Sequence, residues 1–312
     1  MRPKDKARAQ QLSVALKRFH QQKYPLPGIQ VKGCFQSLLE QLIESIHRIE
    51  FVRLVGNRPL STNRADPSSD AFDPLRAAIL HQRAGRIDEA FWLIFIFVHF
   101  GKNRKTGWRL ARDVYGALGG HPWTWSRTSA DPVAFQQWLA TRQVTLAGFD
   151  GVARHFGNHR KYQSLDANSP SGTGAAFISY VAWVGQNRSH TTLMQQALTS
   201  CAGNPRQTFD YLYHSMSAVR SFGRTAKFDY LTMIGKLGLA PIEPGSTYMQ
   251  GATGPVKGAR LLFGDTHGSL SLTELDSRLV QLDTELNVGM QVHEDALCNW
   301  QKSPQMFRPF RG

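Results

Sequence analysis

A short basic segment, SFGRTAKFDYL at residues 221–231, contains residue types that can hold a phosphate. Gly223 permits a tight turn, and the apolar pattern after it predicts a helix from about Arg224. The first N–H groups of a helix have no partner within it, so this end attracts anions. Arg224 and Lys227 add positive charge. An inert corner between two helices has the same pattern, and the segment alone leaves both interpretations open.

Three carboxylates follow this segment and are candidates for acid–base chemistry. Glu243 lies in the turn-rich stretch APIEPGSTY, 17 residues after Ala226. Asp265 and His267 form a rival pair, and Asp229 lies on the predicted helix. A carboxylate beside a sugar can activate water or stabilise a developing positive charge. Glu243 as an exposed loop residue and Asp229 as a surface residue are the alternatives.

A second glycine-rich stretch, YMQGATGPVKGARLLFGDTH, spans residues 248–267. It is either another phosphate-binding hairpin or the wall of a pocket for a flipped base. Gly251, Thr253 and Gly254 are candidate pocket residues, and Lys257 and Arg260 are candidate DNA-binding residues.

Two further stretches echo each other, HFGKNRK from His99 and HFGNHRK from His155. Each places a glycine and clustered cations after an apolar or helical segment, where Lys102 is a candidate phosphate ligand. A glycine ending a helix, with cations that complement its dipole, explains either copy equally well.

Polar and aromatic residues elsewhere suit a base-binding pocket. Gln186 and Asn187 follow an apolar helix and could hydrogen-bond a base or an attached sugar. Trp123 could stack on an extruded base. A capped helix end and core packing are the respective alternatives.

The segment around Gly223 resembles the hairpin of the helix-hairpin-helix DNA glycosylase superfamily. Its members carry an apolar residue, glycine, a basic pair, Thr or Val, and Ala. The motif in this chain is one residue shorter than usual, and its residues are Phe222, Gly223, Arg224, Thr225 and Ala226. The resemblance implies a hairpin that grips the DNA backbone, and a catalytic carboxylate at about the separation of Glu243. The superfamily normally has Asp there. Bifunctional members use a lysine where this chain has Arg224, so water is the expected nucleophile.

Most of the chain, from about Ile87 to Lys302, resembles the α-glutamyl/putrescinyl-thymine pyrophosphorylase-like family, especially its third clade. The stretches that carry the resemblance are HFGKNRKTGWRLARDVYGALGG, FGRTAKFDYL, GATGPVKGARLLFG and EDALCNWQK. The resemblance implies hypermodified pyrimidines in phage DNA as the setting, with enzymes that build or attack the modification.

These features predict a monofunctional DNA glycosylase that flips out a hypermodified pyrimidine of phage DNA, such as a glycosylated hydroxymethylcytosine or modified thymine. It would leave an abasic site and serve in anti-phage defence. The alternative is a pyrophosphorylase-type transferase, which displaces pyrophosphate from an activated hydroxymethyl pyrimidine and joins an amine in its place. A DNA-binding scaffold without catalysis is a third reading.

Composition agrees with a polyanionic partner. The 312 residues include 37 Lys and Arg against 23 Asp and Glu, a formal charge of +14. The three cysteines form no CxxC pair, and the 11 histidines show no metal-ligand spacing, so we expect neither disulfide nor metal, and no cofactor. The N-terminus lacks the apolar stretch of a signal peptide, and the strongest apolar run, 91–98, is too short to span a bilayer. We expect a cytoplasmic protein without a membrane or an obligate protein partner.

Helical periodicity dominates the elements that must position these residues. Residues 37–54 place an apolar residue every three or four positions, which predicts one buried stripe. Asp73 and Asp131, each before a proline, mark helix starts, and Ser271 with Glu274 predicts a capping box. The fold prediction is mainly α, with a helix-hairpin-helix glycosylase-like arrangement.

Two loops divide this pattern, at residues 57–74 and 166–174. The second loop suggests an N-terminal helical region, 1–165, and a C-terminal one, 175–312, sharing one core and a cleft.

Overall fold

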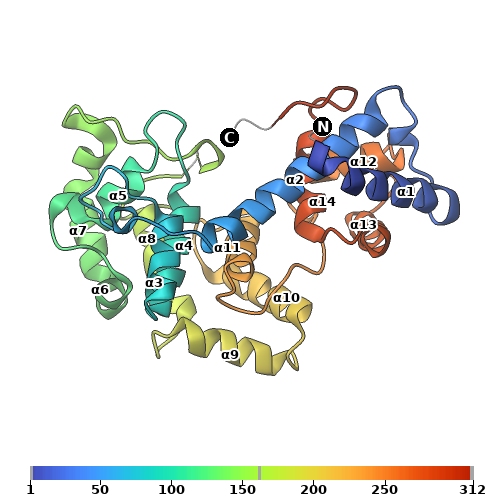
Figure 1. Ribbon diagram of the computed structural model, residues 1–312. Coiled ribbons are helices and arrows are strands. Elements are labelled where there is room, and N and C mark those ends of the chain that lie inside the picture. The colour runs from blue at the N-terminus through green and yellow to red at the C-terminus, as the bar shows by residue number, and fades with distance from the viewer. Residues whose placement is uncertain (1–2, 161–162, 310–312) are drawn as a thin grey trace. The chain divides into compact units, whose positions relative to one another are not determined.

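The computed structural model describes residues 3–160 and 163–309, and these residues confirm the prediction of a mainly α protein. No strand of a sheet occurs among them; two isolated bridges are the only extended pairings in this part of the chain. The α-helices, shown in Figure 1, are α1 Lys6–Gln22, α2 Cys34–Gly56, α3 Pro74–Arg83, α4 Ile87–Phe100, α5 Arg109–Tyr115, α6 Trp125–Ala130, α7 Pro132–Val144, α8 Thr173–Val184, α9 His190–Ser200, α10 Pro205–Ser215, α11 Arg224–Lys236, α12 Gly254–Phe263, α13 Leu272–Leu286 and α14 Met290–Trp300.

The chain forms two compact units. The first combines Met1–Leu54 with Pro244–Arg311, and the second is the continuous stretch Val55–Glu243. The loop at residues 166–174, where the sequence suggested a boundary, lies inside the second unit. The helices on its two sides, α7 and α8, pack against each other.

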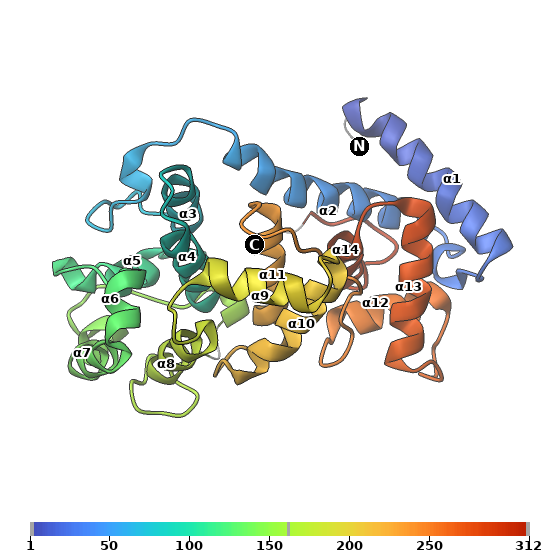
Figure 2. The same ribbon diagram turned by 90° about the horizontal axis from the view of Figure 1, so that it is seen from below.

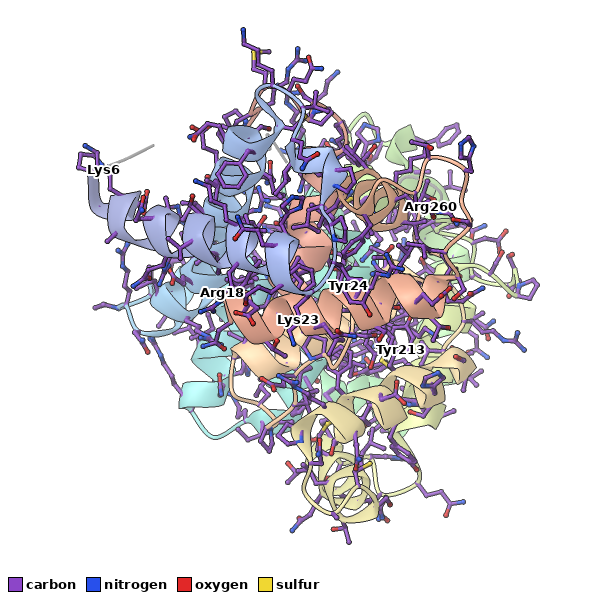
Figure 3. The ribbon with its side chains drawn as sticks, turned by 90° about the vertical axis from the view of Figure 1, so that its right-hand side faces the viewer. Lys6, Arg18, Lys23, Tyr24, Tyr213 and Arg260 are labelled. Carbon is purple, nitrogen blue, oxygen red and sulfur yellow. The ribbon has the colours of Figure 1, made fainter. Side chains whose placement is uncertain are left out.

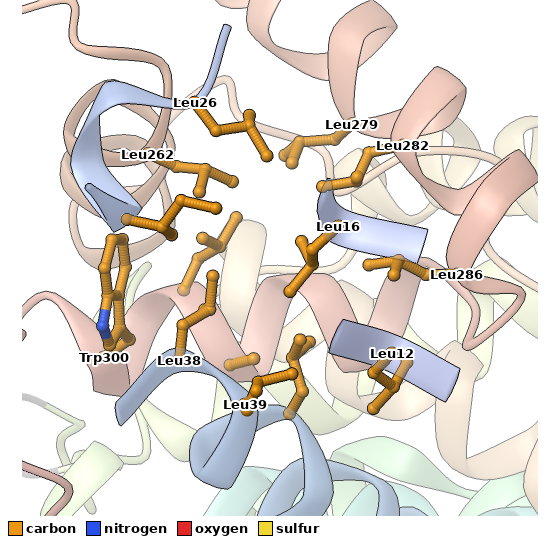
Figure 4. Packing of buried hydrophobic residues seen from close by; sticks show 14 of the residues in the cluster. Leu12, Leu16, Leu26, Leu38, Leu39, Leu262, Leu279, Leu282, Leu286 and Trp300 are labelled. Carbon is orange, nitrogen blue, oxygen red and sulfur yellow. The ribbon is translucent and has the colours of Figure 1, made fainter. Parts of the chain in front are cut away.

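The first unit is built on leucines from both ends of the chain. Leu12 and Leu16 of α1 meet Leu38 of α2 and Leu279 of α13 in one buried cluster, closed by Trp300 (Figure 4). Each of these side chains is almost completely buried, and burial of a leucine contributes about 2 kcal/mol. The stripe predicted for residues 37–54 therefore forms part of this core.

The second unit is organised around α4, which is apolar on all sides. Phe91, Trp92 and Phe95 are buried, and the ring of Phe95 packs against Phe177 and Tyr180 of α8. α3 lies along α4, and α10 lies beside α11, as Figures 1 and 2 show. A helix buried on all sides is expected at the centre of such a unit.

The predicted helix starts are confirmed. Asp73 accepts a hydrogen bond from the backbone N–H of Arg76, and Asp131 accepts one from Ala134, in each case before a proline at the first helical position. Ser271 and Glu274 form a complete capping box at α13. Within the described ranges, no helix has the length and apolarity needed to cross a bilayer.

Candidate functional site

The hairpin before α11 is anchored in the second unit by aromatic packing. Phe222 is buried, and its ring stacks on Phe95 of α4 at 5.0 Å between centroids. Ser221 has a positive φ of 60° and donates its hydroxyl to the Ser171 carbonyl, while Gln163 donates to the Ser221 carbonyl at 3.1 Å. These contacts fix the turn from both sides, so α11 begins at a defined position.

Gly223 precedes α11 without a structural demand for glycine. Its φ of −70° suits any residue, and a Cβ there would meet no atom within 4 Å. Gly223 is also the N-cap. Among residues 3–160 and 163–309, no side chain caps the amino end of α11, so this end is uncovered within those ranges and the N–H groups of its first turn can bind an anion.

The two cations of the hairpin lie against aromatic rings. Arg224 lies over the ring of Phe228 at 4.9 Å. Lys227 lies over Tyr213 of α10 at 4.3 Å and donates to Ser217 at 3.0 Å; Tyr213 is labelled in Figure 3. Partial burial lowers the pKa of Lys227 from its usual range. Both cations thus flank the hairpin in ordered positions.

Asp229 lies one turn after Thr225, on the same side of α11. Its Oδ2 accepts a hydrogen bond from the guanidinium of Arg160 at 2.8 Å. Arg160 is buried and also donates to the Val98 carbonyl at 2.7 Å, so its position is fixed by α4. The Asp229 side chain is 45% exposed, and Oδ1 has no hydrogen-bond partner in the described part of the chain. A positioned carboxylate with one open oxygen is suited to acid–base chemistry.

The two echoing stretches meet beside Asp229. The backbone of Gly157 approaches Gly101 so closely that a Cβ on Gly157 would lie 2.8 Å from the Gly101 carbonyl carbon. The Arg160 stem packs against Gly101, and Lys102, which is exposed, follows directly. The structure therefore joins Arg160 to Asp229 and places the Lys102 backbone against Gly157, three residues before Arg160. Lys161 of the second stretch lies outside the described residues.

Glu243 lies at the other end of α11 from the hairpin. Its backbone N–H donates to the Pro205 carbonyl at the start of α10, and its carboxylate pairs with Arg206 at 2.9 Å. Both side chains of this pair are more than half exposed. The separation from Gly223 is about the length of α11, roughly 20 Å at 1.5 Å per residue. The catalytic role that the resemblance implied for Glu243 stays a prediction, and the structure places its side chain beside Arg206 at the start of α10.

The Asp265 carboxylate is hydrogen-bonded to residues of its own loop. Its carboxylate accepts hydrogen bonds from the backbone and hydroxyl of Ser269 and from the backbone of Leu270, and Arg260 lies 3.6 Å away. Although burial of this carboxyl opposes it, these bonds to Ser269 hold the pKa below its usual range. Arg260, labelled in Figure 3, packs against Gly268 of the same loop. Asp265 and Arg260 thus fix the turn after α12.

The glycines of α12 serve packing between helices of the first unit. A Cβ on Gly254 would lie 2.6 Å from the Cys298 sulfur of α14, and one on Gly258 would lie 2.4 Å from the Leu297 carbonyl. Gly251 has a φ of +77° and forms a turn that favours glycine. Thr253 is the N-cap of α12 but makes no capping bond with its side chain, and Lys257 is exposed.

The other predicted pocket residues, Trp123, Gln186 and Asn187, do not form one pocket. Trp123 is buried, with the guanidinium of Arg127 over its ring at 3.6 Å, so it presents no exposed face to a base. Its partners are the rings of Phe135 and Trp138. Gln186 and Asn187 are exposed in the turn after α8.

A buried polar chain, which the sequence did not reveal, supports α11 from its inner side. Tyr230, next to Asp229, lies 2.8 Å from the Tyr180 hydroxyl, which lies 2.8 Å from His190 Nε2; His190 Nδ1 lies 2.9 Å from Asp88. Burial lowers the pKa of His190, so the imidazole is neutral. Asp88 then accepts from Nδ1–H, Tyr180 donates to Nε2, and Tyr230 donates to Tyr180. The partners of His190 are 10 and 102 residues away in the sequence, so this chain of hydrogen bonds depends on tertiary packing.

Among the described residues, no group of three or more His, Cys, Asp or Glu side chains could hold a metal ion. The candidate site thus consists of the uncovered helix start, its flanking cations and the Asp229 carboxylate.

Comparison with known proteins assigns the chain to a family. The model of alpha-glutamyl/putrescinyl thymine pyrophosphorylase clade 3 matches residues 34–312. Searches of curated proteins and of solved structures gave no match. Because the family model covers both compact units, the chain belongs to the alpha-glutamyl/putrescinyl thymine pyrophosphorylase family, clade 3.

Proposed function

We propose that the protein is a DNA glycosylase that flips out a hypermodified pyrimidine, a modified thymine or glycosylated hydroxymethylcytosine of phage DNA, and hydrolyses its N-glycosidic bond. The observation that carries this proposal is the Asp229 carboxylate, which Arg160 holds five residues after the start of α11. The family description, which names a modified thymine, supports the substrate class. The formal charge of +14 suits DNA as the partner.

In this mechanism the amino end of α11 holds a phosphate of the DNA backbone. The neighbouring sugar then lies toward Asp229, which is five residues after Arg224, the first residue of α11, a rise of about 7.5 Å at 1.5 Å per residue. As the bond between the sugar carbon and the base nitrogen breaks, Asp229 stabilises the positive charge on the sugar or takes a proton from the attacking water. The water oxygen bonds to the anomeric carbon, the base leaves with a proton, and an abasic site remains.

The proposal is tested with DNA that carries hydroxymethylated or glycosylated pyrimidines. Wild-type protein should release free base and leave alkali-sensitive sites. Asp229→Asn should slow release about 100- to 10,000-fold, the usual contribution of a general acid or base. Asp210→Asn, a matched change on α10 of the same unit, should retain the rate. Unaltered DNA after wild-type treatment, or full activity of Asp229→Asn, would contradict this assignment.

Glu243→Gln provides the competing test. Glu243 matches the carboxylate spacing of the superfamily, but it lies at the far end of α11 in an exposed ion pair. We expect this variant to keep most of the base release. If Glu243→Gln abolishes release while Asp229→Asn does not, the catalytic carboxylate is Glu243. If Glu243→Gln, Asp265→Asn and Asp229→Asn all retain function, the noncatalytic scaffold is favoured.

A pyrophosphorylase-type transferase is the second candidate, and the family description favours it. The amino end of α11, with Arg224 and Lys102, would hold the diphosphate of an activated hydroxymethyl pyrimidine. An amine nitrogen would bond to the methylene carbon as the carbon–oxygen bond to diphosphate breaks, and Asp229 would accept the amine proton. Release of pyrophosphate that requires an added amine would support this reaction, and release of free base would exclude it.

A further inference from the structure

We propose that the first unit holds a second ligand site, a small cavity that binds an oxyanion, the carboxylate or phosphate group of a small molecule. The cavity has a volume of about 190 Å³ and lies between α2, the end of α14 and the segment that follows α14. Its polar lining residues are Ser37, Gln41, Asn299, Lys302, Ser303 and Arg308.

A buried amide without a partner points to a missing ligand. Gln41 lines the cavity and is only 2% exposed, yet its Nε2 has no hydrogen-bond partner in the described part of the chain. An unpaired buried donor destabilises a protein, so such groups are rare without a function. Ser37, one turn earlier on α2, is also buried, and its hydroxyl reaches only a distant carbonyl, that of Ser303 at 3.5 Å. The Gln41 amide is therefore available to an acceptor in the cavity, and the Ser37 hydroxyl, whose bond to Ser303 is long, lies one turn from it.

The charge of the lining selects an anion. Lys302 and Arg308 are the charged residues of the cavity, and no carboxylate among the described residues lines it. Lys302 donates to Asn299 Oδ1 at 2.9 Å, which keeps the ammonium at the wall. Together with Gln41, these groups form a set of donors for oxygen atoms that carry negative charge.

The carbonyl end of α14 does not oppose this assignment. The last turn of a helix exposes carbonyls that repel anions. Here the chain's own donors satisfy them: the Gln301 backbone bonds to Leu297, its side chain to Cys298, the Lys302 backbone to Asn299 and the Ser303 backbone to Trp300. These carbonyls are paired, whereas the Gln41 amide on the lining has no partner among the described residues.

The volume limits the ligand to a small molecule. It corresponds to about six water molecules at roughly 30 Å³ each, and it is below the range of drug-sized ligands, about 300–1,000 Å³. Inorganic phosphate or a short dicarboxylate fits this volume. This site is therefore distinct from the hairpin and Asp229, which belong to the second unit.

The site can be tested by calorimetric titration of the full chain at about 0.15 M salt. The two probes are inorganic phosphate and succinate. One-to-one saturable binding of phosphate alone would identify a phosphate site, and binding of succinate alone a carboxylate site. Absence of saturable binding for both probes would overturn the proposal.

Variants distinguish binding of an anion in this cavity from nonspecific attraction of anions to a basic protein. Arg308→Ala should weaken binding about tenfold or more, since a charged hydrogen bond is lost. Lys6→Ala, which removes an exposed cation near the start of α1 (Figure 3), should leave binding unchanged. Equal losses for both variants would show nonspecific screening and contradict the proposal.

Gln41→Leu gives a result that charge alone cannot produce. The leucine removes the unpaired donor and keeps the net charge, so the melting temperature without ligand should rise while probe binding falls about tenfold. If the variant melts lower and binds the probe like wild type, Gln41 serves packing only and the proposal fails. Asp229→Asn should leave probe binding unchanged, so this test is independent of the proposed glycosylase.

Discussion

Two helix starts that combine glycine with cations differ in what surrounds the glycine. Before α11, a Cβ on Gly223 would meet open space, and the residue has an ordinary φ. In α12, Cβ atoms on Gly254 and Gly258 would collide with α14. The same sequence pattern therefore serves close helix packing in the first unit and leaves an uncovered backbone in the second.

The largest expected effect on stability comes from adding one methyl group to the packed helix. Gly258→Ala places a Cβ 2.4 Å from the Leu297 carbonyl, so α12 and α14 must move apart. We expect the free energy of unfolding to fall by about 2–3 kcal/mol, as for overpacked cores. Urea denaturation followed by circular dichroism measures this loss. An unchanged midpoint would show that Gly258 is not limited by packing.

Acidification should lower the stability of the second unit more than that of the first unit. This effect is expected to be smaller than that of Gly258→Ala. Burial, with a smaller contribution from Arg160, lowers the pKa of His99 in the second unit to about 3. The folded state therefore binds fewer protons than the unfolded state, whose histidine pKa is about 6.5; stability is complete above that value and falls as the pH drops toward 3. At pH 5 the loss from His99 is about 2 kcal/mol.

The first unit should keep its stability over the same range. Although burial opposes it, the hydrogen bond from His293 lowers the pKa of Asp283, so its contribution is lost only as the pH falls below about 4. Six of the seven tryptophans belong to the second unit, and their fluorescence follows its unfolding at pH 7 and pH 5.

His99→Gln should reduce the pH dependence, and a part should remain because burial also lowers the pKa of His81, to about 4, and that of His190. His121→Gln, at an exposed position, should leave it unchanged. A pH-independent midpoint for wild type would refute the assignment.

The smallest effect on stability is expected for a substitution of Gly223. Gly223→Ala should change the free energy of unfolding by less than about 1 kcal/mol, because the φ is ordinary and no atom is near. It should weaken DNA binding about tenfold, since the methyl group occupies the place where a phosphate approaches the helix start. Fluorescence anisotropy with a labelled duplex at fixed salt gives the affinity. Gly56→Ala, also at an open glycine, should bind like wild type. Equal affinities for Gly223→Ala and wild type would remove the hairpin from the DNA interface.

Local signals in the sequence predicted much of the fold. The caps at Asp73, Asp131 and Ser271 depend on residues three positions away, and the leucines of α2 and α13 repeat within one helix. Both kinds of pattern are set by helical geometry alone, and the structure confirms them. The packing role of Gly258 was not visible, because its partner carbonyl at Leu297 is far along the chain.

The candidate site was predicted only in part for the same reason. The turn at Gly223 and the carboxylate of Asp229 were recognised from nearby residues. Arg160, which positions Asp229, is 69 residues away, and the chain from Asp88 to Tyr230 depends on tertiary packing. The number of residues between Ala226 and Glu243 favoured Glu243 as the catalytic carboxylate. In the structure, Glu243 lies beside the start of α10, at the end of α11 that is remote from the hairpin.

The division of the first unit has a consequence for synthesis on the ribosome. Its amino-terminal part, up to Leu54, precedes the whole second unit, and its remaining helices emerge only after Glu243. The second unit is continuous and can fold as it emerges, since domains generally fold as units during translation. Until α13 and α14 appear, the leucine faces of α1 and α2 lack their partners. The nascent chain therefore exposes an apolar surface for most of its synthesis, which makes α1 and α2 a natural binding region for chaperones.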